Sequence, residues 1–166
     1  MVRTGQTVEE LSKHFEVVKW RSLDEINAGL MDGLTYEEFA EMYPDHYEAR
    51  KNDKLGYRYP RGESYLDVFQ RLEPVIIEML RQRGPLLIIG HQAILRVLYG
   101  YLTGAGHTSG TLPCCLMRQS VCLLCLLFVP GKKPSETPTL EMPLHTVIQL
   151  TPRAYGCEEI WHSPQI

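Results

Sequence analysis

Apolar side chains recur at helical spacing through residues 64–83, the clearest structural pattern in the sequence. Ser64 occupies an N-cap position, Asp67 follows three residues later, and Gly84 occupies the expected place of a helix C-terminus. We therefore expect one long helix, kinked at Pro74 because proline cannot donate the helical hydrogen bond. The apolar residues that share one face of this helix are Val68, Phe69, Leu72, Ile76 and Met79.

Shorter helices are indicated on both sides of this segment. Thr7 with Glu10 and Thr35 with Glu38 match the capping-box pattern, in which a hydroxyl and a carboxylate satisfy the first backbone N–H groups. The second box precedes a helix expected over residues 36–42. The other expected helices cover residues 44–51, opened by a proline, and residues 93–101.

Residues 86–89 form a continuous apolar run, which is typical of a parallel strand buried on both faces. Weaker strand patterns cover residues 17–20, 147–150 and 159–161. Helix, buried strand and helix in alternation predict an α/β layered fold, in which ligands bind just past the carboxyl ends of the strands. His91 stands at such a place.

Size and composition narrow the function classes. With 166 residues, 44% of them apolar, the chain should form one globular domain, and its net charge of −3 argues against nucleic acid or an anionic membrane as main partner. The longest apolar run, residues 121–129, is too short to span a bilayer, and no secretory leader is evident. Four of the five cysteines lie between Cys114 and Cys125. We expect a cytoplasmic protein with reduced thiols, no cofactor and no metal site.

His91 directly follows the apolar run and precedes a helix. Backbone N–H groups at a helix start favour anions, and a cationic imidazole would strengthen that preference. Arg96 lies about one turn into the helix, close enough to share a ligand with His91 and Gln92. The alternative is a histidine that merely ends a strand, and the residues alone leave both interpretations open.

Two further groups could carry chemistry. A basic cluster interleaved with tyrosines suits a phosphate, because arginine forks grip phosphate oxygens in pairs; a solvated loop balanced by acidic neighbours is the alternative. Asp24 and Glu25 lie beside apolar side chains, which can make one of them a general acid, although most such pairs are surface charge. The cations of the basic cluster are Arg50, Lys51, Lys54, Arg58 and Arg61.

Taken in order, these segments resemble the fructose-2,6-bisphosphatase domain of the bifunctional 6-phosphofructo-2-kinase/fructose-2,6-bisphosphatase family, in the histidine phosphatase superfamily. The resemblance implies a phosphoglycerate-mutase-like three-layer fold with a mostly parallel sheet. The motifs that carry it are RTGQT (3–7), LDEINAG (23–29), LTYEEF (34–39), YRYPRGESYLDV (57–68), QRLEPVI (70–76), GHQAILR (90–96) and PLHTV (143–147).

The resemblance also implies a mechanism and a set of site residues. A histidine of an RHG motif attacks the 2-phosphoryl group to form a phosphohistidine, which water then hydrolyses. Glu25 would protonate the leaving oxygen, while His91 and Arg3 hold the phosphoryl group. Tyr155 matches a tyrosine near a nucleotide site, and ATP would bind through a parent kinase domain. Residues that match the sugar and 6-phosphate site are Tyr36, Arg50, Lys54, Tyr65, Gln92 and Arg96.

The sequence departs from the family pattern at two places. None of the six histidines follows an arginine and precedes a glycine, so the nucleophile and the first strand of the sheet are expected to be missing. Residues 105–131 interrupt the family pattern, and we interpret them as translated intron; the CxxC of Cys122 and Cys125 lacks a second pair at zinc spacing.

Three functional hypotheses remain. The chain is a fragment of a fructose-2,6-bisphosphatase, a non-catalytic phosphosugar-binding remnant, or a histidine phosphatase with another substrate. The pocket residues Tyr36, Arg50, Lys54 and Tyr65 argue against the third hypothesis. The first is favoured over the second because a missing central strand would leave sheet edges unpaired. The chain as printed is expected to be inactive.

Overall fold

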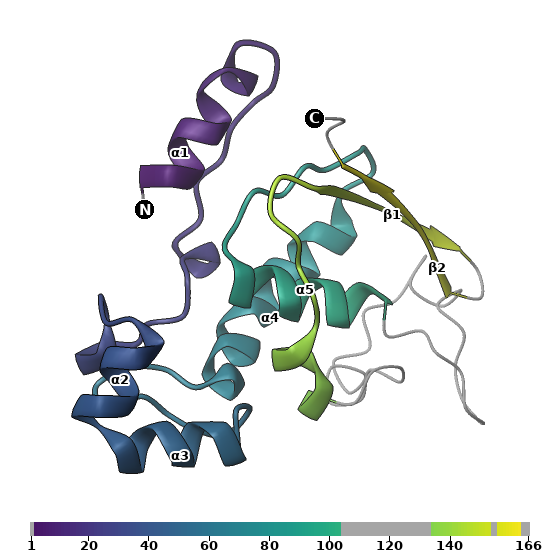
Figure 1. Ribbon diagram of the computed structural model, residues 1–166. Helices are drawn as coiled ribbons and strands as arrows, with labels where there is room; N and C mark the ends of the chain where they lie inside the picture. The colour runs from purple at the N-terminus through teal and green to yellow at the C-terminus, as the bar shows by residue number, and fades with distance from the viewer. Residues whose placement is uncertain (1, 104–133, 154–155, 164–166) are drawn as a thin grey trace. The chain divides into compact units, whose positions relative to one another are not determined.

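A computed structural model describes residues 2–103, 134–153 and 156–163 of the chain (Figure 1). It divides into two compact units, Met1–Leu95 and Arg96–Ile166. The first unit contains helices α1 (Val2–Glu9), α2 (Tyr36–Met42), α3 (Pro44–Asn52) and α4 (Tyr65–Arg81). Helix α5 (Gln92–Thr103) begins in the first unit and continues into the second, which also holds strands β1 (Val147–Arg153) and β2 (Gly156–His162). Short 3-10 turns connect the elements: Leu11–Lys13, Arg21–Leu23, Gly29–Met31 and Pro134–Thr139.

Helix α4 confirms the main sequence prediction. The Ser64 hydroxyl accepts a hydrogen bond from the Asp67 N–H, and the Asp67 carboxylate accepts from the Ser64 N–H at 2.7 Å, so the capping box is complete. Val68 and Leu72 are fully buried. The helix runs through Pro74 and ends at Arg81, two residues before the predicted end. Residues 81–87 are all exposed, so no side-chain burial stabilises a further turn toward Gly84.

The prediction for Thr7 is wrong. Helix α1 starts upstream at Val2 and passes through Thr7, whose hydroxyl donates to the Arg3 carbonyl at 3.1 Å. A threonine hydroxyl inside a helix can bond back to the carbonyl four residues earlier, which removes it from the capping role. A 3-10 turn, Leu11–Lys13, follows the helix.

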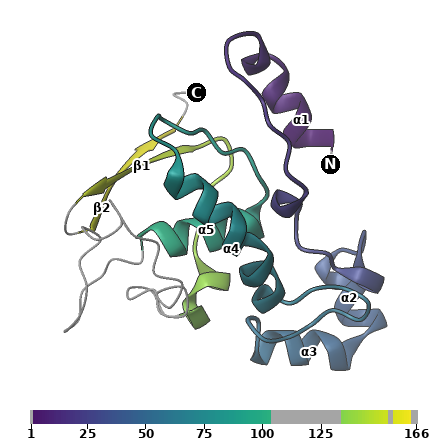
Figure 2. The same cartoon turned by 180° about the vertical axis from the view of Figure 1, so that it is seen from behind.

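Helices α2 and α3 confirm the predictions made for them. Thr35 and Glu38 form the second capping box, with bonds of 3.2 and 2.8 Å, and Pro44 is the first residue of α3. The two helices lie side by side in both views (Figures 1 and 2). The Phe39 ring, 3% exposed, meets the Tyr47 ring edge-on with centroids 5.8 Å apart.

The predicted strands at residues 17–20 and 86–89 are not formed. Both segments run without regular structure, and Leu86 and Leu87 are 53% and 55% exposed. A parallel strand needs neighbours on both edges and cover on both faces, and the described residues provide no such neighbour for either segment. The expected mostly parallel sheet is therefore absent from the described part of the chain, where the one sheet is two-stranded and antiparallel.

Strands β1 and β2 confirm the weaker patterns near the C-terminus. They pair antiparallel from Val147 opposite His162 to Arg153 opposite Gly156. Within the same unit, the Tyr99 hydroxyl on α5 donates to the Glu159 carboxylate on β2 at 2.7 Å. The Tyr99 and Trp161 rings meet edge-on, which ties the helix to the sheet.

Two sequence predictions concern residues that the structure does not describe. Residues 105–131, including the CxxC, and Tyr155 lie outside the described residues. Among the helices that are described, none combines the length and apolar character needed to cross a membrane. The described residues also hold no cluster of potential metal ligands.

Candidate active site

Glu25 lies on the loop between two 3-10 turns, and its carboxylate reaches the start of α5. Oε1 accepts hydrogen bonds from the N–H of Ile26 at 3.0 Å and from the N–H of Ala93 at 3.2 Å. Ala93 is the second residue of α5, where backbone N–H groups have no partner within the helix. The carboxylate of the expected proton donor therefore contacts the backbone directly after His91 and Gln92, the expected substrate-binding residues.

His91 precedes α5 directly and lines a cavity of about 220 Å³. The cavity lies within the first unit, and its wall includes Thr4 of α1, Lys19 and Asp24. A histidine and a lysine in one cavity wall suit a small anion. Arg3 precedes Thr4 on α1 and is exposed; it is not one of the described residues that line this cavity.

Arg50 is the centre of a second cluster, built from α2, α3 and the segment after α3. Its Nε donates to the Tyr59 hydroxyl at 2.6 Å and its Nη2 to the Tyr36 hydroxyl at 3.3 Å. The guanidinium carbon also lies 5.1 Å from the centre of the Tyr36 ring. Burial alone would lower the pKa of Arg50, but the phenols of Tyr59 and Tyr36 beside it raise that pKa above its ordinary value.

Tyr59 connects this cluster electrostatically to Glu25, which the sequence analysis did not foresee. Burial raises the pKa of Tyr59; the neighbouring Arg50 opposes the rise, and Tyr36 and the Glu25 carboxylate add to it. Because Glu25 and Arg50 both act on the Tyr59 phenol, the acid and the Arg50 cluster lie in the same part of the first unit. The signal in the sequence was the alternation of tyrosines with cations from Arg50 to Arg61.

The remaining expected residues are spread over several elements. Lys54 lies half-buried in the turn after α3, and Tyr65, 6% exposed, is the first residue of α4. Gln92 is the exposed first residue of α5. Arg96 belongs to the second unit, where its Nε donates to the Leu140 carbonyl at 2.6 Å.

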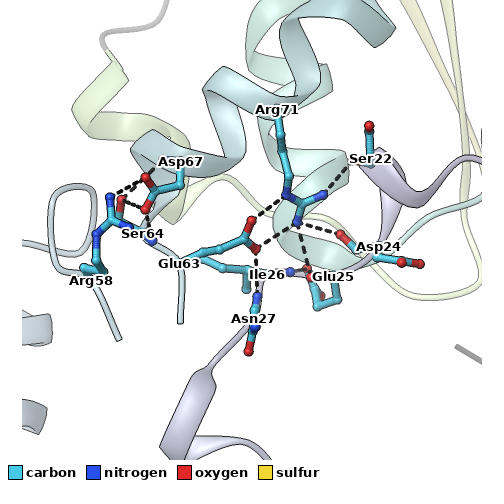
Figure 3. A network of polar contacts seen from close by, with 10 residues as sticks. All are labelled: Ser22, Asp24, Glu25, Ile26, Asn27, Arg58, Glu63, Ser64, Asp67 and Arg71. Carbon is cyan, nitrogen blue, oxygen red and sulfur yellow. Dashed lines mark hydrogen bonds and ion pairs between the residues drawn. The ribbon is translucent and has the colours of Figure 1, made fainter. Parts of the chain in front are cut away.

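Arg71, which the sequence analysis missed, binds the loop that carries Glu25 (Figure 3). From α4, its guanidinium pairs with Glu63 at 2.8 Å and donates to the carbonyls of Ser22 and Asp24 at 2.6 and 2.7 Å. Arg71 and Glu63 are only 22% and 25% exposed, so the ion pair is largely shielded from water. A charged residue next to the buried Leu72 on an amphipathic helix was the one signal that could have pointed to it.

This arrangement can bind an anion and move a proton. A carboxyl group near a histidine can, in its protonated form, donate that proton to an oxygen that leaves a phosphoryl group held there. The arginine held by two phenols can grip a second phosphate.

Comparisons with known proteins agree with this chemistry. A family model described as the histidine phosphatase superfamily, branch 1, matches residues 1–136. The chain is 48% identical over 145 residues to a 6-phosphofructo-2-kinase/fructose-2,6-bisphosphatase of Arabidopsis thaliana, which covers 87% of the chain and 16% of that protein. It is 42% identical over 158 residues to the chicken (Gallus gallus) protein of the same name, covering 95% of the chain and 27% of that protein.

A third relative is named for the phosphatase activity alone. The chain is 44% identical over 154 residues to a fructose-2,6-bisphosphatase of Saccharomyces cerevisiae, covering 93% of the chain and 27% of that protein. The chain thus spans between 16% and 27% of the length of these three relatives.

Proposed function

Because this chain belongs to the histidine phosphatase superfamily, we propose that it is part of a fructose-2,6-bisphosphatase. The reaction removes the 2-phosphoryl group of fructose 2,6-bisphosphate and yields fructose 6-phosphate and phosphate, and it would thereby control glycolysis and gluconeogenesis. Identities of 42% to 48% over most of the chain to proteins named for this activity support the proposal.

The observation that carries the proposal is the hydrogen bond between the Glu25 carboxylate and the N–H of Ala93. It holds a carboxyl group beside His91, where the 2-phosphoryl group would sit. In the proposed reaction, a histidine nitrogen attacks phosphorus, the bond from phosphorus to the fructose oxygen breaks, and Glu25 gives its proton to that oxygen. His91 and Arg3 would hold the phosphoryl oxygens and balance their charge. Water then hydrolyses the phosphohistidine.

The rest of the substrate would occupy the tyrosine-rich cluster. Arg50, positioned by Tyr36 and Tyr59, would bind the 6-phosphate together with Lys54. We assign Tyr65, Gln92 and Arg96 to contacts with the sugar and its 6-phosphate as well. The assignment of ATP to Tyr155 and to a parent kinase domain, like the cytoplasmic location, stays a prediction.

Two proposals concern the parent protein. The nucleophilic histidine would be supplied by an RHG motif outside the printed sequence, since none of the six histidines here has that context. Residues 86–89, which form no regular structure here and of which Leu86 and Leu87 are exposed, would join a mostly parallel sheet with strands of the parent chain. Sequencing the full transcript tests the first point and shows whether the parent chain encodes further strand segments, and it also shows whether the message skips residues 105–131.

A non-catalytic phosphosugar-binding protein is the second candidate, favoured by the assembly of the Arg50 cluster in a sequence without RHG. The transcript separates the two candidates, because only the first predicts an in-frame RHG motif upstream. Calorimetry with fructose 2,6-bisphosphate and an assay of released phosphate test what both candidates expect of this chain. We expect the printed chain to bind the sugar and release no phosphate, with Arg50→Ala weakening binding and Arg81→Ala leaving it unchanged. Phosphate release with a phosphohistidine on the printed chain would overturn the assigned nucleophile, and an absence of binding would overturn both candidates.

A further inference from the structure

We infer that Arg71 is a positioning residue for Glu25: with Glu63, it holds the 22–27 loop so that the Glu25 carboxylate docks on the start of α5. The inference deepens the proposed function and rests on it for the role of Glu25. The contacts of Arg71 and Glu63 with this loop are drawn in Figure 3. None of the sequence motifs assigned a role to Arg71.

The guanidinium of Arg71 acts as a multiple donor to backbone oxygens of this loop. Nη1 donates to the Ser22 carbonyl at 2.6 Å, and Nη2 donates to the carbonyls of Asp24 at 2.7 Å and Glu25 at 3.3 Å. Three carbonyls that converge on one side chain fix the path of the backbone on both sides of Glu25. A planar arginine fork can do this, whereas a lysine ammonium presents a single nitrogen.

Glu63 orients the guanidinium and ties the far end of the same loop. Its Oε1 accepts from Arg71 Nε at 2.8 Å, and its Oε2 accepts from Arg71 Nη2 at 3.1 Å and from the Asn27 N–H at 2.9 Å. The Glu63 N–H in turn donates to the Asn27 carbonyl at 2.8 Å. The loop is thus held from Ser22 to Asn27 by two side chains, Glu63 just before the N-cap of α4 and Arg71 in the second turn of that helix.

The Glu25 carboxylate, held in this way, accepts a hydrogen bond from the Ala93 N–H, which has no partner within its own helix. The Ala93 N–H precedes the first intrahelical bond of α5, which the Leu95 N–H makes to the His91 carbonyl at 2.9 Å. If Arg71 positions Glu25, loss of the Arg71 fork should release Ala93 while leaving the Leu95 bond intact. These two amides therefore separate displacement of the acid from loosening of the whole unit.

The experiment is amide hydrogen exchange measured by NMR on the full chain, without substrate. Glu25→Ala removes the carboxylate and gives the reference for an Ala93 N–H without this acceptor. We expect Ala93 to exchange about tenfold or more faster in this variant than in the unsubstituted chain. We expect Arg71→Lys and Glu63→Gln to speed Ala93 exchange in the same direction, with Leu95 unchanged. Arg81→Lys is the matched control, because Arg81 also pairs with a carboxylate on α4 but at an exposed position.

Two results of this experiment would overturn the inference. Unchanged Ala93 exchange in Arg71→Lys would overturn the inference, and so would equal acceleration of Ala93 and Leu95, since that marks a merely structural role. If Arg71→Lys fails to fold by circular dichroism, Glu63→Gln decides by the same two amides. Because no substrate enters this measurement, the proposed bisphosphatase activity can fail in its own assay while the positioning of Glu25 stands.

Discussion

The Nε of Arg50 and the hydroxyl of Tyr59 are joined by a hydrogen bond of 2.6 Å. In the described part of the chain, the polar partners of Arg50 are two neutral phenols, Tyr59 and Tyr36, rather than a carboxylate. The guanidinium is thus oriented while its positive charge stays uncompensated. Such an arginine is prepared to accept a phosphate.

Tyr59→Phe should weaken the binding of fructose 2,6-bisphosphate because it removes the hydroxyl that orients Arg50. We expect about three- to tenfold weaker binding, near 1 kcal/mol, from calorimetry at neutral pH. Tyr47→Phe is the control, since Tyr47 contacts Phe39 through its ring and that ring is kept. Equal affinities of Tyr59→Phe and the unsubstituted chain would refute the orienting role of the hydroxyl.

The free energy of unfolding should fall in strong alkali because of the raised pKa of Tyr99. Burial, with the hydrogen bond to Glu159, raises the pKa of Tyr99 from its ordinary 10.0 to about 12. Above pH 10 the unfolded chain loses this proton while the folded chain keeps it, so stability is full below pH 10 and declines as the pH rises toward 12.

Urea unfolding midpoints at pH 9 and pH 11.5 measure this effect. We expect the midpoint of the unsubstituted chain to fall more between the two values than that of Tyr99→Phe, which has no proton to lose there. Parallel declines in both proteins would assign the alkaline loss to other groups.

Ser64→Ala should destabilise α4. The serine is 3% exposed and completes the capping box with Asp67, so its loss leaves a helical N–H without its partner. Loss of such a cap costs about 1 kcal/mol of unfolding free energy, measurable by urea denaturation. Ser12→Ala is the comparison, because the Ser12 hydroxyl bonds at an exposed position after α1 and should cost far less.

Leu72→Ala should cost about 2–5 kcal/mol, because Leu72 is fully buried and its truncation leaves a cavity. Leu66→Ala on the same helix should cost much less, because Leu66 is 46% exposed. Equal losses of unfolding free energy in the two variants would contradict the burial pattern of α4.

The elements predicted correctly are those whose causes lie close in sequence. The capping boxes at Thr35 and Ser64 and the periodic apolar face of α4 are local, so their helices followed from the residues alone. The pattern at Thr7 was misread because its hydroxyl bonds backward within α1. The run at residues 86–89 was misread because apolar content cannot show whether neighbouring strands are present.

The site was foreseen unevenly for the same reason. Motif resemblance pointed to Glu25 and Arg50, and the structure brings the first to α5 and the second to Tyr36. Arg71 was missed because its partners are backbone carbonyls 46 to 49 residues away, which no side-chain pattern encodes. Tyr59 was missed because its importance depends on burial beside Arg50.

The capped start of α4 should also influence how long the Glu25 carboxylate stays bound to the start of α5. Glu63 grips the Glu25 loop, and the next residue, Ser64, is the cap itself. Fraying of that first turn would carry Glu63 away from Asn27 and free one end of the loop. We therefore expect the lifetime of the bond between the Glu25 carboxylate and the Ala93 N–H to depend on this helix terminus. A substitution at the cap should then alter the proposed proton donation without changing any group proposed to meet the substrate.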